Sequence, residues 1–278
     1  MNICIVGLGL IGGSFARAIS TRTGNTVFGF DASPSACGKA LAEGAISGIA
    51  TDKDIAKCDI IIIALYPKAT VEFAEKNINL FKENAIILDT CGVKGFVCEK
   101  ISALAKGKNI TFIGGHPMAG IEKSGFENSF ASLFDGASMI LCPSEDTDKG
   151  AIDTLSSLCT ECGFDRITIS TPDHHDKVIA FTSQLAHLVS SAYVFGEYAT
   201  EHSGFSAGSY KDMTRVARLN ADMWTELFFE NKENLSAVCG ELIANLEKFK
   251  VALDENDRDK IHSMLSDGNK RKIISDSL

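Results

Sequence analysis

The sequence predicts a doubly wound α/β sheet over residues 1–171, followed by an all-helical domain over residues 172–278. Three observations support this prediction. Short apolar runs alternate with amphipathic segments up to residue 170, as in a sheet that helices cover on both faces. A glycine-rich turn joins the first run to the first amphipathic segment. After Thr171–Pro172 the hydrophobic period becomes almost wholly helical.

The strands are expected where apolar, often β-branched residues run continuously, because such runs suit strands that are buried on both faces. They are residues 2–6, 26–30, 60–65, 85–89 and 110–114. Amphipathic segments such as 70–81 and 96–105 lie between them, and right-handed crossovers then predict a parallel sheet. Two further runs, 137–141 and 166–170, extend the sheet with mixed strand direction.

Helices are expected in the second half, with a mobile turn at Gly204–Gly208. They are residues 173–201, 210–217, 222–253 and 254–278. A mostly apolar helix as long as 173–201 needs cover on most of its sides, which a small domain barely supplies. We therefore expect a homodimer formed through the C-terminal helices.

Composition excludes several classes of function. The net charge of -9 argues against nucleic acid as a partner, because phosphate contacts need clustered Lys and Arg. No apolar run is long enough to span a membrane, and the start lacks the basic region of a signal peptide. Nine scattered cysteines suit reduced thiols in the cytoplasm, and the Cys159–Cys162 pair has no companion that would complete a metal site. We expect a cytoplasmic protein without a metal.

The residues Gly7-Leu8-Gly9-Leu10-Ile11-Gly12 follow the first predicted strand and open a helix. In this context Gly7 permits a tight turn, Gly9 lets the backbone approach a pyrophosphate, and Gly12 lets helix and strand pack closely. The free N–H groups and the positive dipole end of the helix favour phosphate binding. The pattern predicts a dinucleotide site, and the alternative is a turn that merely needs glycines.

Asp31 stands at the end of the second predicted strand, where a carboxylate can bind the adenosine ribose. Its charge would repel a 2′-phosphate, and neither Ala32 nor Ser33 supplies a compensating arginine. The expected cofactor is therefore NAD rather than NADP. As an alternative, Asp31 could cap the next helix, a role that Ser33 could also take.

His116 lies in Gly114-Gly-His-Pro-Met-Ala-Gly120, directly after the fifth predicted strand. Loops at the carboxyl ends of strands line the ligand crevice of a doubly wound sheet, and the pKa of a histidine suits a general base.

Two other groups of residues leave alternatives open. Ser183 and His187 share a helix face that could line a cleft, or the hydroxyls could bond the preceding turn. Arg215 suits carboxylate recognition, but spacing alone favours a surface ion pair with Asp212.

Taken together, these segments resemble the prephenate dehydrogenase family, which includes arogenate and cyclohexadienyl dehydrogenases. The resemblance runs over nearly the whole chain and rests on GLGLIGGS, DTCGVKG, GGHPMAGIEKSGFENS, SQLAHLVSSA, YKDMTRVA and MWTELFFENKEN. It implies a Rossmann-type domain followed by an all-α dimerisation domain, with the active site where the two meet.

The resemblance also implies roles for single residues. His116 matches the catalytic histidine that contacts the ring hydroxyl, Arg215 matches the arginine that binds a substrate carboxylate, and His187 with Ser183 matches the substrate-side pair. The implied reaction is NAD-dependent oxidative decarboxylation of prephenate to 4-hydroxyphenylpyruvate. The chain departs from the family at Gly92, where many members have a serine, so a hydroxyl contact to the substrate is lost or comes from Thr90.

Three alternatives remain open at this stage. Arogenate, which carries an ammonium group, would want a carboxylate, and Glu122 lies in the right loop. Other two-domain dehydrogenases share the glycine turn and the helical second half, but neither GGHPMAG nor TRVA fits them. A protein that senses NAD without catalysis would also need the glycine turn.

Overall fold

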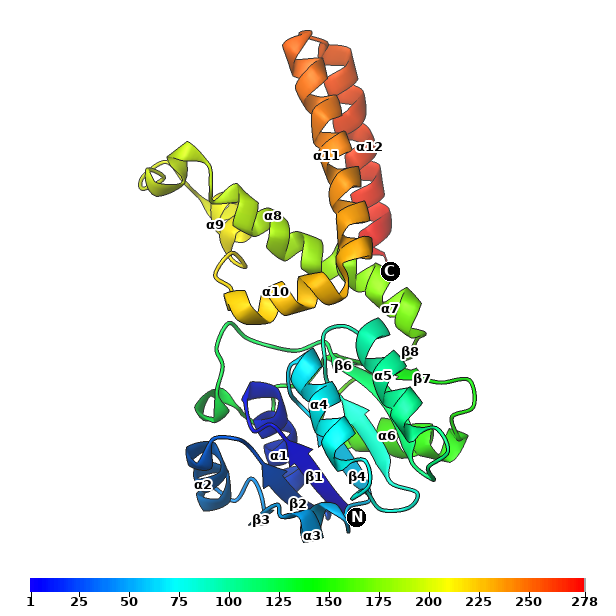
Figure 1. Cartoon of the computed structure of the whole chain (residues 1–278). Coiled ribbons are helices and arrows are strands. Elements are labelled where there is room, and N and C mark those ends of the chain that lie inside the picture. Colours follow the sequence, from blue (N-terminus) through cyan, green and yellow to red (C-terminus); the bar gives the residue numbers. More distant parts are fainter. Residues whose placement is uncertain (278) are drawn as a thin grey trace. The chain divides into compact units, whose positions relative to one another are not determined.

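The computed structural model describes residues 1–277 and contains two compact units, Met1–Asn231 and a second unit that begins at Lys232. In the first unit an eight-stranded sheet lies between two layers of helices (Figure 1). Its strand order is β3-β2-β1-β4-β5-β6-β7-β8. The strands are β1 (Asn2–Val6), β2 (Thr26–Phe30), β3 (Gly48–Ile49), β4 (Ile60–Ile63), β5 (Ile86–Asp89), β6 (Thr111–Pro117), β7 (Ser138–Pro143) and β8 (Arg166–Ile169).

The strand directions confirm a doubly wound sheet with one reversal. All neighbouring strands are parallel except β6 and β7, which are antiparallel. The strand order changes direction between β1 and β4, because the chain builds outward to β3 and then returns to the other side of β1. In such sheets the ligand crevice lies at this switch point, outside the carboxyl ends of the strands.

The central strands are buried on both faces, which explains their unbroken apolar sequences. All four isoleucines of β4 are fully buried. Helices α1, α2 and α6 build one core with one face of the sheet, and α3, α4 and α5 build the other. The helices of these two layers are α1 (Leu10–Arg22), α2 (Pro34–Ala42), α3 (Asp52–Ile55), α4 (Pro67–Asn77), α5 (Gly95–Ala105) and α6 (Lys149–Glu161).

The structure corrects two sequence predictions within the sheet. The short strand β3 was not predicted, because two residues carry no readable hydrophobic period. Strand β6 was expected to end at residue 114 but continues to Pro117, so His116 lies on the strand and not in a loop after it. Pairing with β7 extends β6, since His116 lies opposite Ile140 and Pro117 opposite Met139.

The helices after residue 171 are more broken than the apolar pattern predicts. The long helix expected over 173–201 ends at Tyr193 and contains a π-helical turn, Ala180–Gln184. The helix expected over 222–253 is interrupted at Asn231, whose side chain is buried in hydrogen bonds to α7 and to the π-helical turn. The helices of the first unit here are α7 (Pro172–Ile179), α8 (Leu185–Tyr193), α9 (Gly208–Thr214) and α10 (Ala221–Glu230).

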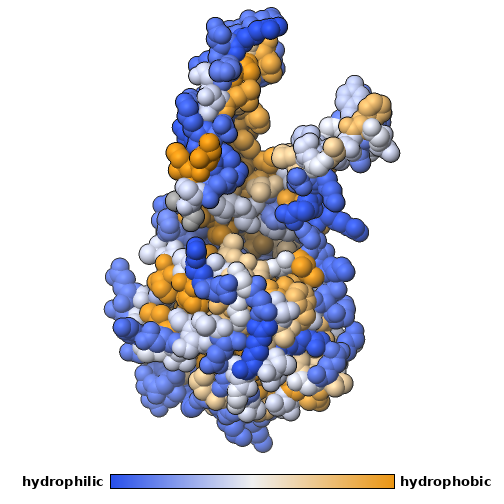
Figure 2. All heavy atoms as spheres, turned by 180° about the vertical axis from the view of Figure 1, so that it is seen from behind, coloured by the Kyte–Doolittle hydropathy of each residue, from blue (hydrophilic) through white to orange (hydrophobic). Residues whose placement is uncertain are grey.

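The second unit is a hairpin of two long helices, α11 (Lys232–Asp254) and α12 (Arg258–Asp276). Asn256 adopts a left-handed conformation (φ 53°) in the turn, and the Asp257 side chain caps α12 by accepting from the N–H of Lys260. Apolar side chains remain exposed along both helices, and Figure 2 shows some of them in orange. They include Ile243, Leu246, Val251, Leu253, Leu265, Ile273 and Ile274. Within residues 1–277, no helix combines the length and apolar character that crossing a bilayer requires.

Candidate functional site

The glycine turn has the geometry that its spacing predicts. Gly7 is left-handed (φ +89°), and a Cβ on Gly12 would lie 1.8 Å from the Gly7 carbonyl oxygen. A Cβ on Gly9, in contrast, would meet nothing within 4 Å. Protein packing therefore requires glycine at positions 7 and 12, whereas the open space beside Gly9 is available to a ligand.

Helix α1 begins in this turn, and among the described residues no side chain caps it. Its first intrahelical bond runs from the N–H of Gly13 to the carbonyl of Gly9, so the N–H groups of Leu10, Ile11 and Gly12 have no partner within the helix. These groups and the helix dipole suit a bound pyrophosphate. The residues present therefore fit the phosphates of a dinucleotide.

Asp31 links the glycine turn to the end of β2. Its carboxylate accepts the N–H of Leu8 at 2.7 Å and the N–H of Ser33 at 2.7 Å. The cap of α2 is Ser33, which accepts from Ala36, so the alternative in which Asp31 caps that helix is wrong. Asp31 remains half-buried beside the turn, where its oxygens have further lone pairs for a ribose.

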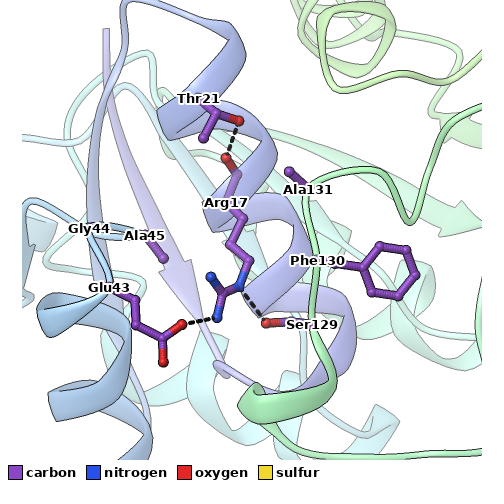
Figure 3. Close-up of a pocket in the computed structure, with 8 residues that line it drawn as sticks. All are labelled: Arg17, Thr21, Glu43, Gly44, Ala45, Ser129, Phe130 and Ala131. Atoms are coloured by element: carbon purple, nitrogen blue, oxygen red, sulfur yellow. Dashed lines mark hydrogen bonds and ion pairs between the residues drawn. The ribbon is translucent and has the colours of Figure 1, made fainter.

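A hollow of about 220 Å³ lies beside α1, away from the glycine turn (Figure 3). The Arg17 guanidinium, which lines this hollow, is already paired with Glu43 at 2.6 Å, and it donates to the Ser129 hydroxyl at 2.9 Å. It also lies over the Phe126 ring, 4.4 Å from the centroid. These contacts dock the segment after β6 onto α1, so we assign the hollow a structural role.

A buried ion pair holds the strand that carries His116. Lys94, at the start of α5, is fully buried and pairs with Asp89 at the end of β5. Its Nζ also donates to the carbonyl of Gly115 at 2.6 Å, while Asp89 accepts the N–H of Gly115 at 3.0 Å. Burial acts to lower the pKa of Lys94, but the carboxylate of Asp89 and the neighbouring Cys91 and Cys98 together outweigh this effect, and the pKa is raised. Lys94 thus stays charged and fixes the residue before His116.

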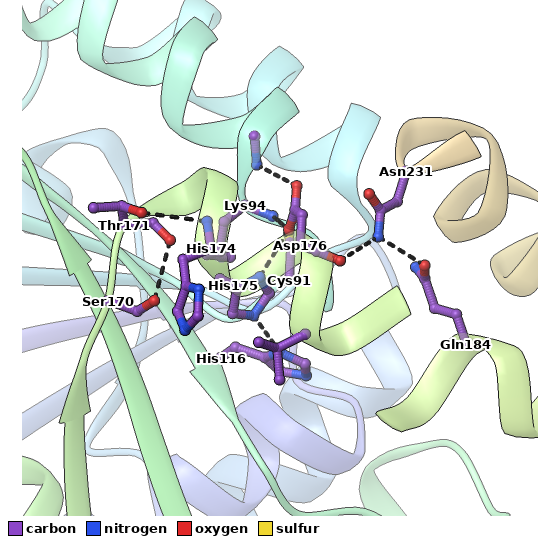
Figure 4. A network of polar contacts seen from close by, with 12 residues as sticks. Cys91, Lys94, His116, Ser170, Thr171, His174, His175, Asp176, Gln184 and Asn231 are labelled. Atoms are coloured by element: carbon purple, nitrogen blue, oxygen red, sulfur yellow. Dashed lines mark hydrogen bonds and ion pairs between the residues drawn. The ribbon is translucent and has the colours of Figure 1, made fainter. Parts of the chain in front are cut away.

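His116 is the first member of a chain of hydrogen bonds that sequence reasoning missed (Figure 4). Its Nδ1 lies 2.8 Å from Nε2 of His175, and Nδ1 of His175 lies 2.7 Å from Oδ1 of Asp176. The carboxylate of Asp176 accepts the N–H of Lys94 at 2.8 Å and that of Gly95 at 2.8 Å. The available signal was the His-His-Asp run that opens α7, a polar sequence on a helix expected to be mostly apolar.

Burial and nearby charge lower the basicity of both rings. Burial lowers the pKa of His116 well below 6.5, and the charges of His175 and Lys94 act in the same direction. Burial also lowers the pKa of His175, although the hydrogen bond to Asp176 opposes this effect. His116 is therefore neutral at pH 7, with one nitrogen able to accept a proton.

The free nitrogen of His116 faces Gly92 and helix α10. A Cβ on Gly92 would lie 3.8 Å from Nε2 of His116 and 3.4 Å from a methyl group of Leu227. Gln184, in the π-helical turn, donates to the carbonyl of Leu227 at 3.1 Å, and Asn231 donates to Gln184 at 2.8 Å. These buried amides hold α10 against the site.

The residues expected on the substrate side are only partly brought together. His187 donates from Nδ1 to the carbonyl of Val216 at 3.2 Å and packs its ring 3.9 Å from that of Trp224. Burial lowers the pKa of His187. Ser183 lies in the π-helical turn, and Thr90 is half-buried just beyond β5. Ser190, three residues after His187 on α8, has a buried hydroxyl with no hydrogen-bond partner among residues 1–277, so it does not bond the preceding turn.

Arg215 was expected within a helix over residues 210–217, but α9 spans Gly208–Thr214 and Arg215 follows its last residue. Its guanidinium donates to Oε1 of Glu122 at 3.0 Å. The alternative of an ion pair with Asp212 is therefore wrong, because the ion pair of Arg215 is with Glu122. The pair is largely exposed, at 65% for Arg215 and 51% for Glu122, so it is open to competition from a ligand.

Comparisons with known proteins match both halves of the chain to one family. Residues 15–168 match the family model "Prephenate dehydrogenase, nucleotide-binding domain", and residues 171–267 match "Prephenate dehydrogenase, dimerization domain". The chain is 30% identical to the cyclohexadienyl dehydrogenase of Zymomonas mobilis, over 98% of this chain and 95% of that protein.

Two solved structures are similar over nearly the whole chain. Arogenate dehydrogenase from Synechocystis has a TM-score of 0.85 at 26% identity and covers 99% of this chain and 100% of its own. Prephenate dehydrogenase from A. aeolicus, solved with hydroxyphenyl propionate and NAD⁺, has a TM-score of 0.84 at 28% identity, covering 99% and 98%. These matches confirm the resemblance that the sequence motifs indicate. The chain belongs to the prephenate dehydrogenase family, whose members are oxidoreductases built from a nucleotide-binding domain and a helical dimerisation domain.

Proposed function

We propose that this chain catalyses the NAD-dependent oxidative decarboxylation of prephenate to 4-hydroxyphenylpyruvate, a step of tyrosine biosynthesis. The observation that carries the proposal is the placement of His116, whose Nε2 lies beside Gly92 while its Nδ1 is engaged by His175. Membership of the family and the NAD⁺ in the A. aeolicus relative support the same assignment.

When bound, NAD supplies the hydride acceptor. On the substrate, hydride leaves C4 of the ring while Nε2 of His116 takes the proton of the C4 hydroxyl. The electrons of the bond to the ring carboxylate then move through the ring onto the C4 oxygen as CO₂ departs. The ring becomes aromatic, and the C4 oxygen regains a proton from the protonated His116. His116 suits the role of base because its lowered pKa keeps it neutral at pH 7.

We assign the cofactor to the residues around the glycine turn. The N–H groups at the start of α1 receive the pyrophosphate, and Gly9 leaves room for it. Asp31 binds the ribose hydroxyls and disfavours a 2′-phosphate. These assignments cover Gly7, Leu8, Gly9, Leu10, Ile11, Gly12 and Asp31.

The substrate side comprises Arg215, His187, Ser183 and Thr90. Arg215 exchanges its exposed partner Glu122 for a substrate carboxylate, which offers two parallel hydrogen bonds to a guanidinium. Thr90 follows β5 two residues before Gly92 and supplies a hydroxyl on the same edge of the sheet as His116.

A second candidate substrate is arogenate, which undergoes the same reaction to give tyrosine. The specific observation in its favour is Glu122, whose carboxylate is half exposed and could hold the ammonium group of arogenate. The Synechocystis relative is named for that substrate.

We also propose that the protein is a cytoplasmic homodimer. Within each chain, the NAD-binding domain ends near residue 171 and the substrate and dimerisation domain follows. The exposed apolar side chains of α11 and α12 support association through these helices. The nine cysteines are all free thiols, eight of them buried, as suits a reducing compartment.

The test is NADH formation on adding prephenate or arogenate, with wild-type protein, His116→Asn and a matched control, His174→Asn. His174 is an exposed neighbour of the hydrogen-bonded chain. We expect turnover of prephenate by the wild type and the control, and a loss of at least ~10²-fold in kcat for His116→Asn. Full turnover by His116→Asn would refute the mechanism, and preference for arogenate would favour the second candidate.

A further inference from the structure

The buried pair His175–Asp176 lies on the side of His116 that faces away from Gly92. We propose that His175 and Asp176 are positioning residues that determine which nitrogen of His116 carries the proton. The inference rests on the proposed function of His116 as the base, but it concerns two residues to which that function assigns no role.

The donor and acceptor roles in this series of hydrogen bonds are set at Asp176. Its Oδ1 accepts the N–H of Lys94 and its Oδ2 accepts the N–H of Gly95, both at 2.8 Å. A carboxylate whose two oxygens accept backbone N–H groups at the start of a helix acts as an acceptor toward its third neighbour. His175 therefore donates its Nδ1–H to Asp176 across the contact of 2.7 Å.

The same reasoning assigns the protonated nitrogen of both imidazole rings. A neutral imidazole with hydrogen on Nδ1 has its lone pair on Nε2, so Nε2 of His175 accepts across the 2.8 Å contact with His116. His116 consequently carries hydrogen on Nδ1 and its lone pair on Nε2, which is the nitrogen nearest to Gly92. The side chain of His175 is 0% exposed, so water does not compete for either of its nitrogens.

The same hydrogen bonds also stabilise the positive charge that forms when His116 accepts a proton. The new imidazolium keeps its Nδ1–H bond to His175, which in turn is polarised by Asp176. The other charges that face the rings are Lys94, from the start of α5, and Asp89, from the end of β5, and these two are paired with each other. Asp176 is thus the carboxylate that reaches the histidine pair through hydrogen bonds.

The test compares His175→Leu with His175→Gln. Leucine removes the acceptor for Nδ1–H of His116, whereas the amide oxygen of glutamine can replace it. We expect His175→Leu to lower kcat by ~10²-fold with KM for prephenate within about twofold of wild type, since only proton transfer is impaired. The kcat of His175→Gln should be at least about tenfold higher than that of His175→Leu.

An NMR measurement reads the tautomer without turnover. In ¹⁵N spectra of the unliganded protein, we expect wild type and His175→Gln to show His116 protonated on Nδ1, and His175→Leu to show a mixture of tautomers. A mixture in the wild type, or equal kcat losses in both variants, would overturn the inference. If the wild type has the expected tautomer but does not oxidise prephenate, the proposed function fails and the positioning role stands.

Discussion

Asp31 accepts a hydrogen bond from the N–H of Leu8 at 2.7 Å, so the residue expected to choose the cofactor also braces the glycine turn to which we assign the pyrophosphate. The contact joins the carboxyl ends of β1 and β2, which are adjacent and parallel. In the proposed cofactor site, a single carboxylate therefore couples the geometry of the glycine turn to the recognition of the ribose.

Asp31→Asn is expected to raise KM for NAD by about tenfold, because a hydrogen bond to a charged acceptor is worth roughly 1.5–3 kcal/mol. Discrimination against NADP should fall because the repelling charge is gone. Steady-state kinetics with both cofactors measure this. Ser33→Ala is the matched control, since it removes only the cap of α2. An unchanged KM for NAD in Asp31→Asn would remove Asp31 from the cofactor site.

Alanine substitutions at Gly9 and Gly12 are expected to separate binding from folding. The new methyl group of Gly9→Ala would contact none of the residues that the structure describes, so its thermal midpoint should match wild type while its affinity for NAD falls at least about tenfold. Gly12→Ala places a methyl group against the Gly7 carbonyl and should destabilise the fold by about 1–3 kcal/mol or more. Thermal unfolding and calorimetric titration with NAD check both. Tight NAD binding by Gly9→Ala would contradict the assignment.

Arg215→Ala is expected to raise KM for prephenate at least about tenfold with little change in kcat, because the lost contact is with a carboxylate remote from C4. The thermal midpoint should not move, since an exposed ion pair contributes little to stability. Arg218→Ala, an exposed arginine on the same segment, is the control. Equal KM values in the two variants would exclude Arg215 from substrate binding.

Gly92→Ser tests the departure from the family pattern. Gly92 is not left-handed, and its Cβ would make ordinary contacts with Leu227 and His116, so the fold should accept the change. The new hydroxyl beside Nε2 of His116 should lower KM for prephenate by about threefold to tenfold, the value of one hydrogen bond. Gly92→Ala adds the same carbon without the hydroxyl. If both variants behave alike, no hydroxyl contact is made there.

The pH dependence follows from three histidines, His116, His175 and His187, whose pKa values are all lowered by burial. Below pH 6.5 the unfolded chain binds more protons than the folded chain, so stability should fall as the pH decreases from 6.5 toward the folded-state pKa values. The acid limb of kcat/KM should likewise have its midpoint below 6.5. Thermal unfolding and initial rates across this range provide the measurement. A midpoint above 6.5 would show that another group controls the limb.

Local features of the chain could be predicted from the sequence because their causes are local. Continuous apolar runs predicted the long strands, and glycine spacing after β1 predicted a turn whose conformation the structure confirms at Gly7. The motif around His116 singled out a histidine that the structure places near the carboxyl end of β6, although it misplaced the end of that strand. That end depends on pairing with β7, which is a tertiary contact.

The tertiary structure decided which distant side chains meet. His116 and His175 are separated by 59 positions, Lys94 and Asp176 by 82, and Glu122 and Arg215 by 93. Hydrophobic period and turn chemistry carry no information on such pairs, because the partners are set by strand order and by how α7 and α10 pack on the sheet. The sequence by itself thus determined the fold class, the conformation of the glycine turn and the candidate histidine. Only the folded chain revealed the hydrogen bonds that orient that histidine and the carboxylate that holds Arg215.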